Sequence, residues 1–520
     1  MNPSITDEYT IGAVAGISSY LKNRIIIKVL AQCSVLSYHN LGIGNEVEKM
    51  FKEFSIKNYR AIDEQGLDLS LSPLTILVGP SGSGKSSFLE AVALTAQSAI
   101  EDPSRYDLVL NGSIIDIYGG LTRQYNIGKE IYNAKDVLRK LSTGFEIRID
   151  EERWNQSGFA NSPPPIIKNA TTWPPNTFSY SWGRKGTDGS WKACWSHVFS
   201  VDGMRCFEIE TSATDDGAPG SYITKLRLGD LSEYCGETVN LGIDFERVLH
   251  EGLASNSLIN SIPTSHPQVL EIFKTSLSFL QFIRKELLAQ LNKTSFLSGL
   301  RGKQLLKSES GTESGRIGQH GELAKRLLVS QRARRHPAYQ KLQKWASRFN
   351  LHEIDSSLVD SNEISISFLD KATNSILEIE SGAAGSIQGL LIATQILLAE
   401  PGCCHLVEEP EIHMHPQFEA ELALLFANAI ELGQQIIVTT HSEILISAIA
   451  NAVRSKRIPS GQVSIWHLER SSTGKIENKN VEISEKGNID GWISSFRQIE
   501  EKLFDEWTQA LPVAQKKDSY

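Results

Sequence analysis

The sequence predicts an α/β fold in two parts that are separated by a large α+β insertion. A short apolar segment at 74–78 leads through a glycine-rich loop into a helical pattern at 87–94. Two later apolar segments, 403–407 and 435–439, have the length of buried strands, and each ends in polar residues. Between these parts, residues 151–374 change in composition. This order of strands and helices favours an α/β architecture with an inserted region.

The glycine-rich loop has the form GxxxxGKS, which is a complete phosphate-binding loop. Gly79 and Gly84 allow a tight turn that points successive N–H groups inward at phosphates. Lys85 places a positive charge there, and Ser86 offers a hydroxyl to Mg²⁺. The residues expected to bind the nucleotide are Gly79, Pro80, Ser81, Gly82, Ser83, Gly84, Lys85, Ser86 and Ser87. The alternative, a chance turn between a strand and a helix, is disfavoured because both flanks also match.

Composition narrows the class of protein. The 520 residues exceed one compact core, and 40% hydrophobic with 22% charged residues is ordinary for a soluble globular protein. The net charge of −9 argues against a surface that binds nucleic acid throughout, but allows a local basic patch. The six cysteines show no CxxC spacing, so reduced thiols without a metal site are expected. No segment reaches the roughly 18–20 apolar residues of a membrane span. We expect a cytoplasmic protein without a membrane partner.

Residues 1–50 form an N-terminal extension of uncertain status. Met50 stands directly before 51–60, which has the pattern of a first strand of the nucleotide domain. One hypothesis is that translation begins at Met50. The other is a real extension, because 11–36 has the pattern of one or two amphipathic helices. The sequence leaves both open.

Residues 51–150 are predicted to form the first part of the nucleotide domain. Between 54 and 78 the pattern is strand, turn, strand, turn, strand, and leucines alternate with period two at 67, 69 and 71. Further strands are expected at 108–117 and 145–149, with a loop at 118–124 between them.

The insertion at 151–374 begins as a β-rich region with several tryptophans. A local aromatic core explains them better than a base-stacking platform, because basic residues are not densely interleaved. Helical patterns follow at 268–291 and 323–349, and strands are expected at 364–369 and 376–379. Segment 301–335 is the most basic part of the chain. It is a candidate contact for nucleic acid, although such a run is more often a solvated face.

Residues 375–505 are predicted to complete the nucleotide domain, followed by a tail at 506–520. After a helix at 386–399, a buried strand ends in Glu408 and Glu409. In a P-loop ATPase the first carboxylate holds Mg²⁺ and the second orients and deprotonates the attacking water. The next strand ends at His441, which is placed to reach the γ-phosphate. A solvated strand end and a structural histidine are the alternatives. The segment 464–507 is expected to form a strand pair and a helix, without the clustered acids of a nuclease.

Four segments together resemble a known family. They are Ile56-Lys57-Asn58-Tyr59-Arg60, the loop 79–86, Glu408-Glu409-Pro410-Glu411-Ile412-His413-Met414-His415-Pro416, and Thr439-Thr440-His441-Ser442. Their order resembles the ABC-type ATPases, and within them the overcoming-lysogenization-defect-like and SMC-like branch of AAA-family ATPases. The resemblance implies an ABC-type P-loop ATPase head with a mixed sheet that uses ATP and Mg²⁺.

The resemblance also implies further site residues. Arg60 would contact the nucleotide, and the family's glutamine loop would place Gln124 at the metal. The signature loop, which contacts the γ-phosphate of a partner subunit, is degenerate here, and its best match is 381–388 with Ser381 and Gly385. Glu408 stands where the family usually has aspartate.

By this resemblance, two heads would form a homodimer or higher oligomer that sandwiches two ATP molecules, and hydrolysis would open the pair. The leading hypothesis is a nucleotide-driven switch in DNA maintenance or anti-phage defence that works with a separate effector protein. The alternatives are an ATPase that energises transport or another assembly, and a slow-turnover ATP-sensing scaffold.

Overall fold

The apolar strand before the phosphate-binding loop, β3 (Leu74–Val78), lies inside a six-stranded sheet. All five of its residues are buried, as expected for a parallel strand that is covered on both faces. The computed structural model describes residues 51–101, 108–117, 141–147, 155–159, 161, 176–184, 191–201, 204–213, 222–228, 238–240, 279, 281–299, 301, 316–333, 337–358, 364–489 and 502–508.

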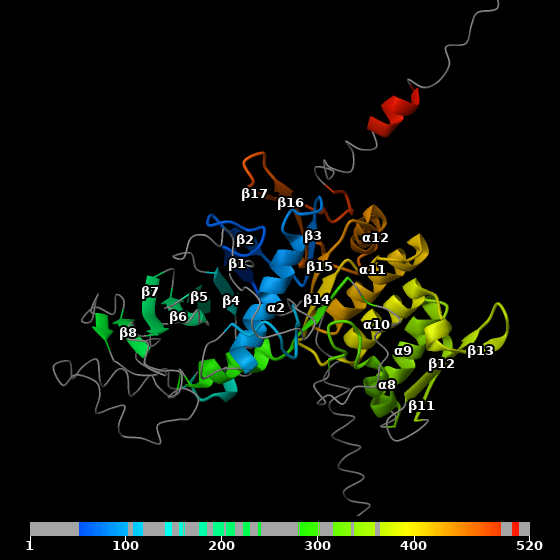
Figure 1. Cartoon of the computed structure of the whole chain (residues 1–520), viewed down its shortest axis with the longest axis horizontal. Helices are drawn as coiled ribbons and strands as arrows, with labels where there is room; N and C mark the ends of the chain where they lie inside the picture. Colours follow the sequence, from blue (N-terminus) through cyan, green and yellow to red (C-terminus); the bar gives the residue numbers. More distant parts are fainter. Residues whose placement is uncertain are drawn as a thin grey trace, which may run out of the picture. The chain divides into compact units, whose positions relative to one another are not determined.

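The six-stranded sheet has the order β10-β14-β15-β3-β16-β17 (Figure 1). Its other strands are β10 (Thr294–Leu297), β14 (Cys404–Glu408), β15 (Gln435–Thr439), β16 (Val463–Arg470) and β17 (Ile476–Val481). The five strands from β10 to β16 are mutually parallel, and β17 pairs antiparallel with β16. The predicted α/β fold with a mixed sheet is therefore confirmed.

Helices cover both faces of this sheet. They are α2 (Lys85–Glu101), α10 (Ala384–Leu398), α11 (Pro416–Glu431) and α12 (Glu443–Arg454). Figure 1 shows α2 on one side of the sheet and α10, α11 and α12 on the other. Two helices begin where the sequence caps them, because the His415 and Ser442 side chains accept from the N–H groups of Gln417 and Leu445.

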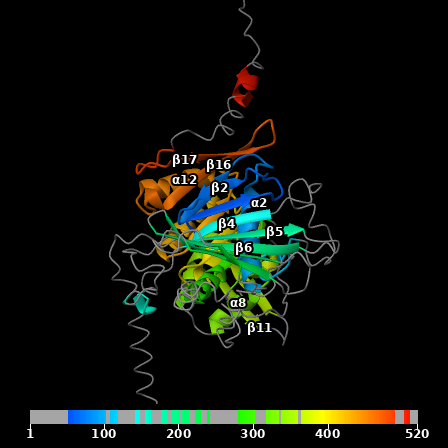
Figure 2. The same cartoon turned by 90° about the vertical axis from the view of Figure 1, so that its left-hand side faces the viewer.

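A second, antiparallel sheet packs against the other side of α2. Its order is β2 (Leu67–Ser70), β1 (Glu53–Lys57), β4 (Leu141–Ile147), β5 (Asn176–Arg184), β6 (Trp191–Val201), β7 (Met204–Ala213), β8 (Tyr222–Leu228) and β9 (Thr238–Asn240). Figure 2 shows β4, β5 and β6 side by side. The described strands of the predicted insertion thus continue a sheet that starts in the nucleotide domain.

The helical part of the insertion carries a third, small sheet. Its elements are a helical segment at 281–291, α8 (Ala324–Ala333), α9 (Pro337–Arg348), and the antiparallel strands β11 (His352–Leu358), β12 (Ile364–Asp370) and β13 (Ser375–Glu378). Two 3₁₀ turns, η3 (Ile379–Ser381) and η4 (Ser460–Gln462), and a short helix at 502–508 complete the described elements. Among the described helices, none combines the length and apolar character needed to cross a membrane.

Two predicted elements differ from the structure. The single helix expected at 323–349 is two helices, because Pro337 starts a new helix instead of continuing one. The strand expected at 108–117 is a loop with one isolated bridge, between Asn111 and Asp116. The buried Gln97 side chain of α2 donates to Val109 and Ile115 and accepts from Ile114, so this side chain takes the place of a neighbouring strand.

Strands of the predicted insertion pair with strands of both predicted parts of the nucleotide domain. Strand β10 belongs to the predicted insertion 151–374, yet it pairs in parallel with β14 of the second part. The residues 1–50, the loop 118–124 and most of the tail 506–520 lie outside the described residues.

The close packing of α10 on α9 gives a first prediction. A Cβ atom on Gly389 would lie 2.5 Å from the ring of Phe349, which is fully buried. Overpacking of this kind costs about 1–3 kcal/mol, and the better helix propensity of alanine returns up to about 1 kcal/mol. We expect Gly389→Ala to lower the free energy of unfolding by about 1–2 kcal/mol, measured by urea titration.

The matched control is Gly461→Ala, where an added Cβ meets nothing within 4 Å. This variant should unfold like the natural chain. A stabilised Gly389→Ala would show that the α9 and α10 contact is looser than the structure has it.

A buried histidine between β10 and β14 gives a pH prediction. His405 is fully buried, and its Nδ1 shares a hydrogen bond of 2.8 Å with Ser295 Oγ. Burial lowers the pKa of His405 from 6.5 to about 4. Between these two values the unfolded chain binds a proton that the folded chain does not, so this stabilisation is complete above pH 6.5 and is lost as the pH falls to about 4.

The expected loss is about 3 kcal/mol for this one group. His405→Gln keeps a polar partner for Ser295 but has no titration, so its unfolding free energy should fall less over the same pH interval. Parallel pH profiles for the two proteins, measured by chemical denaturation, would contradict this assignment.

Candidate nucleotide-binding site

The phosphate-binding loop joins β3 to α2 in a conformation that requires glycine. Gly79, Gly82 and Gly84 have φ angles of 143°, 80° and 95°, in the region that side chains rarely adopt. A Cβ atom on Gly79 would lie 2.0 Å from the carbonyl oxygen of Leu468 in β16. Helix α2 begins at Lys85, so its first N–H groups face the loop. The loop therefore has the tight form that a phosphate cradle needs.

Lys85 bends back over its own loop. Its Nζ donates to the carbonyl oxygens of Gly79 and Pro80 at 2.8 and 2.9 Å. Burial lowers the pKa of Lys85, while the charges of Glu409, Glu411 and Glu408 oppose that shift. The ammonium group thus lies in the field of three carboxylates, which are the acidic residues at and just beyond the end of β14.

The acidic pair diverges at the end of β14. The Glu408 carboxylate turns towards β10, where its Oε2 accepts from Gly299 N at 3.1 Å and from Ser298 Oγ at 3.5 Å. Glu409 follows β15 instead, because its N–H donates to the carbonyl and hydroxyl oxygens of Thr439. Glu409 has a φ of 39°, a left-handed conformation that is costly for a side chain with a Cβ.

Glu409 and His441 lie together, as the sequence predicted for two residues of one site. The distance from Glu409 Oε1 to His441 Nε2 is 3.5 Å, and both side chains are about one-third exposed, at 31% and 37%. Burial and the charge of Lys85 lower the pKa of His441, and Glu409 opposes the shift. At neutral pH this imidazole is therefore uncharged.

Glu411 connects the acidic strand end to the histidine strand end. Its Oε1 accepts from Thr440 Oγ1 at 2.7 Å and from His441 N at 2.6 Å. Burial raises the pKa of the Glu411 carboxyl, which its hydrogen bonds oppose. Sequence analysis included Glu411 in a motif without giving it a role, because its contacts depend on how the loop after β14 folds back.

A second group that the sequence analysis missed lies under the acidic pair. Arg301 is only 5% exposed, and its guanidinium donates to the carbonyl oxygens of Leu297, Glu408 and Glu409. Burial lowers the pKa of Arg301 to about 10, so it stays charged at neutral pH. The only local signal was Phe296 and Leu297 followed by Ser298 and Gly299, a short form of the strand-then-polar pattern of β14 and β15.

The residues assigned from the resemblance are less concentrated. Arg60, with a φ of 48°, forms an ion pair of 2.5 Å with Glu90 of α2. Ser381 is exposed at the end of η3, and Gly385 lies in the first turn of α10. A Cβ on Gly385 would lie 2.5 Å from the carbonyl oxygen of His413, so α10 begins close against the segment that follows the acidic pair. Gln124 lies outside the described residues.

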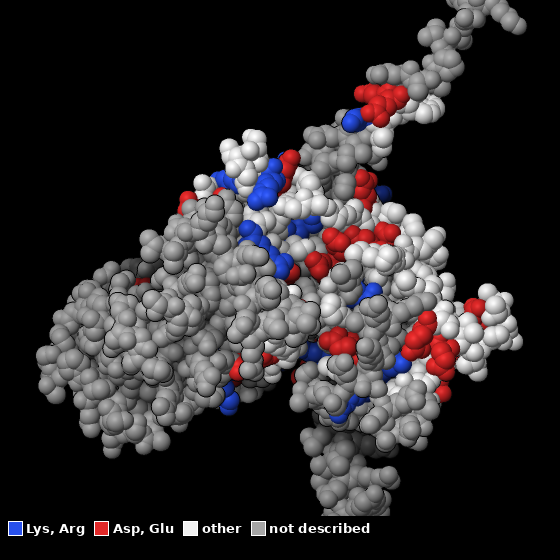
Figure 3. All heavy atoms as spheres, in the orientation of Figure 1, with Lys and Arg blue, Asp and Glu red and all other residues white. Residues whose placement is uncertain are grey.

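The described part of the basic segment 301–335 is largely engaged within the protein. Arg301 contacts the strand ends, Arg316 Nε donates to the carbonyl oxygen of Thr294 at 2.9 Å, and Lys325 Nζ lies 2.6 Å from Glu380 Oε1. Figure 3 shows basic and acidic side chains interspersed over the described surface of one face. Arg334 and Arg335 of this segment lie outside the described residues. Arg301, Arg316 and Lys325 thus have partners within the protein, and contact of this segment with nucleic acid stays a prediction.

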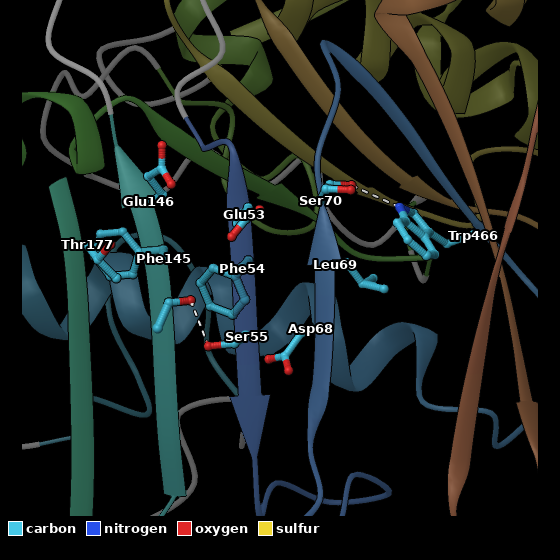
Figure 4. Close-up of a pocket in the computed structure, with 11 residues that line it drawn as sticks. Glu53, Phe54, Ser55, Asp68, Leu69, Ser70, Phe145, Glu146, Thr177 and Trp466 are labelled. Atoms are coloured by element: carbon cyan, nitrogen blue, oxygen red, sulfur yellow. Dashed lines mark hydrogen bonds between the residues drawn. The ribbon is translucent and has the colours of Figure 1, made fainter. Parts of the chain in front are cut away.

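A groove of about 420 Å³ lies on the outer face of β1, β2, β4 and β5 (Figure 4). Its lining includes the acidic side chains of Glu53, Asp68 and Glu146 and the indole of Trp466, whose Nε1 donates to the carbonyl oxygen of Ser70. No residue of the phosphate-binding loop and no member of the acidic pair lines it. This groove is separate from the nucleotide site.

Two family models match the chain. Residues 53–161 match a model described as an AAA domain, and residues 270–446 match one described as an AAA ATPase domain. The first match contains the phosphate-binding loop. The second contains the acidic pair, His441 and Arg301. Each half of the site therefore lies in a segment that resembles an ATPase.

Solved structures with a distant likeness are heads of SMC proteins. A head bound to the C-terminal winged-helix domain of ScpA is 12% identical, covers 84% of this chain and 98% of its own, and has a TM-score of 0.37. A Pyrococcus furiosus head with an extended coiled coil is 11% identical, covers 87% and 99%, and has a TM-score of 0.37. A Thermotoga maritima head is 12% identical, covers 83% and 99%, and has a TM-score of 0.35.

Because these TM-scores are below 0.5, the assignment depends on the family models and on the site itself. The structure joins the two matched halves at one edge of a mixed sheet, where a phosphate-binding loop, an acidic pair and a histidine meet. The chain is a P-loop ATPase that binds and hydrolyses ATP, and both parts of its site lie in segments that match AAA models.

Proposed function

We propose that the chain is a nucleotide-driven switch in which Glu409 is the general base for ATP hydrolysis. The observation that carries this proposal is the position of Glu409, with its N–H bound to Thr439 and its carboxylate beside His441. Burial lowers the pKa of Lys85, which belongs to the phosphate loop, and the charge of this carboxylate opposes that shift. A base in this position orients a water molecule and accepts its proton.

Phosphate binding falls to the loop and to Lys85. The Lys85 ammonium donates to two carbonyl oxygens of its own loop, and phosphate oxygens are better acceptors because they are charged. The N-terminus of α2 adds its N–H groups and the positive end of its dipole. Binding of ATP thus exchanges contacts within the loop for contacts to the nucleotide.

The oxygen groups of Ser86 and Glu408 fit a magnesium ion. Mg²⁺ prefers oxygen ligands and is commonly held by one or two protein groups together with phosphates and water. When bound, the ion neutralises charge that develops on the phosphate oxygens. Gly299 N–H holds one Glu408 oxygen in a fixed direction.

His441 is proposed to sense the γ-phosphate. Its neutral imidazole can donate one N–H to a phosphate oxygen without adding a charge to the site. Glu411 fixes the main chain of His441 by accepting from its N–H. His441 would therefore contact the phosphate from a strand end that Glu411 links to the segment after the acidic pair.

The switch is proposed to work as a head-to-head homodimer. Ser381 is exposed beside the start of α10, which packs against the segment after the acidic pair. A partner's ATP could be contacted there, in the manner that the ABC-type resemblance implies. A role with a separate effector in DNA maintenance or anti-phage defence is supported only by the resemblance of the motifs to the overcoming-lysogenization-defect-like and SMC-like branch.

Removal of the general base tests the mechanism. We expect Glu409→Gln to lower ATP turnover by about 10²–10⁴-fold while ATP affinity stays the same, because the amide cannot accept the proton. Turnover is followed by phosphate release and affinity by equilibrium titration with ATP and Mg²⁺. The control is Glu431→Gln at the exposed end of α11, which should hydrolyse ATP at the natural rate. Unchanged turnover in Glu409→Gln would remove Glu409 from the mechanism.

The dimer is tested at the exposed serine. In the Glu409→Gln background, ATP and Mg²⁺ should trap a dimer that light scattering detects. Ser381→Arg should weaken this dimer by about 100-fold or more, which is about 2.7 kcal/mol, because an unpaired charge would be buried at the contact. Ser455→Arg, at an exposed position after α12, should dimerise normally. A Ser381→Arg protein that still forms the ATP-dependent dimer would refute the signature-loop assignment.

A further inference from the structure

The segment after β10 reaches under the acidic pair from a distant part of the sequence. β10 and β14 are parallel neighbours, with Leu297 opposite Val407, so Ser298 and Gly299 leave the sheet beside Glu408. Ser298 and Gly299 contact the Glu408 carboxylate, and Arg301 contacts the main chain. One short segment thus touches both the side chain and the backbone of the predicted metal ligand.

Arg301 joins the ends of two strands through three carbonyl oxygens. Its Nη1 lies 3.2 Å from Leu297 O and 3.0 Å from Glu408 O, and its Nη2 lies 3.2 Å from Glu409 O. A planar guanidinium can make these contacts at once, whereas a lysine ammonium is a single point. Gln388 of α10 holds the segment in turn, because its Nε2 donates to Arg301 O at 3.4 Å.

The backbone at this point is strained and sets the direction of two side chains. Glu409 has a φ of 39°, a left-handed conformation that needs support from its surroundings. From here the Glu408 carboxylate lies against the segment after β10, and the Glu409 carboxylate lies 3.5 Å from His441 Nε2. Arg301 donates to the carbonyl oxygens of both residues, so it holds the main chain at the point where the two carboxylates diverge.

We propose that Arg301 is a positioning residue for ATP hydrolysis, which holds the Glu408–Glu409 main chain so that the Glu409 carboxylate faces the attacking water. The proposal rests on the function proposed above for Glu409. Arg301 is buried below the carbonyl groups and acts on hydrolysis only through Glu409. Its loss should therefore affect the chemical step more than nucleotide binding, which belongs to the phosphate loop.

A partly buried arginine with a structural role, Arg316, offers a control. Arg316 also donates to main-chain carbonyl oxygens of the β10 region, at Thr294 and Asn292, but at the opposite end of the strand from the acidic pair. Burial lowers the pKa of Arg316 as it does that of Arg301. A substitution at either position removes hydrogen bonds to the β10 region. Only a substitution of Arg301 also removes a hydrogen bond to the main chain of Glu409.

The test compares Arg301→Lys and Arg316→Lys in the full chain. We expect Arg301→Lys to lower kcat by about 10–100-fold with unchanged ATP affinity, because a small misplacement of a catalytic group has an effect of this size. Arg316→Lys should keep the natural kcat even if its melting temperature falls as much as that of Arg301→Lys. In the Glu409→Gln background, measured by single turnover, Arg301→Lys should change the residual rate little, since two changes on one path are not additive.

Several results would overturn the inference. Equal loss of kcat in Arg301→Lys and Arg316→Lys would show a structural role, and so would full additivity with Glu409→Gln. If Arg301→Lys keeps the natural kcat while Glu409→Gln is slow, the inference about Arg301 is refuted and the proposed function of Glu409 still stands. Natural turnover in Glu409→Gln would refute the proposed function and this inference with it.

A second variant decides the question if Arg301→Lys does not fold. Gln388→Met removes the hydrogen bond to Arg301 O but keeps the volume, and the Gln388 Oε1 atom has no hydrogen-bond partner that would be lost. We expect a smaller fall in kcat, about 2–10-fold, without a fall in melting temperature. Natural kcat in this variant would contradict the positioning role.

Discussion

The structure depends on the parallel pairing of buried strands whose carboxyl ends meet at one edge of the six-stranded sheet. β3 ends in the phosphate loop, β14 in the acidic pair, and β15 in the segment that carries His441. The register of Glu408 opposite Thr439, and Thr439 opposite Leu77, brings groups from distant parts of the sequence to a common level. Because these strands are buried on both faces, a slip in register would disrupt the side-chain packing on each face, so the core fixes the site.

This convergence places three carboxylates close together, and two cations offset the repulsion between them. Glu408, Glu409 and Glu411 all act on the charges of Lys85 and Arg301. Lys85 lies on the side of the phosphate loop, and Arg301 is buried with its guanidinium on the main chain of the pair. Removal of either cation would leave like charges in a partly buried site, where they are costly. Burial raises the pKa of the Glu411 carboxyl, and the nearby charge of Glu409 adds to this shift.

Sequence alone predicted the parts of the fold whose signal is local. Continuous apolar runs identified β3, β14 and β15, and the glycine pattern identified the loop. The position of β10 was missed because Thr294–Leu297 is short and half polar, and its burial comes only from its place beside β14. The segment 108–117 was wrongly predicted as a strand. Backbone groups of this segment form hydrogen bonds with the side chain of Gln97, and the sequence pattern does not show this. Arg301 looked like part of a solvated basic run, since only the folded chain shows that its partners are carbonyl groups.

The packing suggests which parts of the molecule respond to the phosphate loop. Helix α2 begins at Lys85 and buries Phe88 against Phe54 of β1, and one core continues through Phe145 to Phe178 of the antiparallel sheet. The same core includes Leu406 and Ile437 of the six-stranded sheet. Tightly packed cores transmit small displacements rather than absorb them. A shift of α2 on phosphate binding would therefore reach the β-rich insertion directly, whereas α10 responds through the acidic pair, Arg301 and Gln388. Both routes start at the nucleotide site, so the switch proposed above would report ATP to two different surfaces.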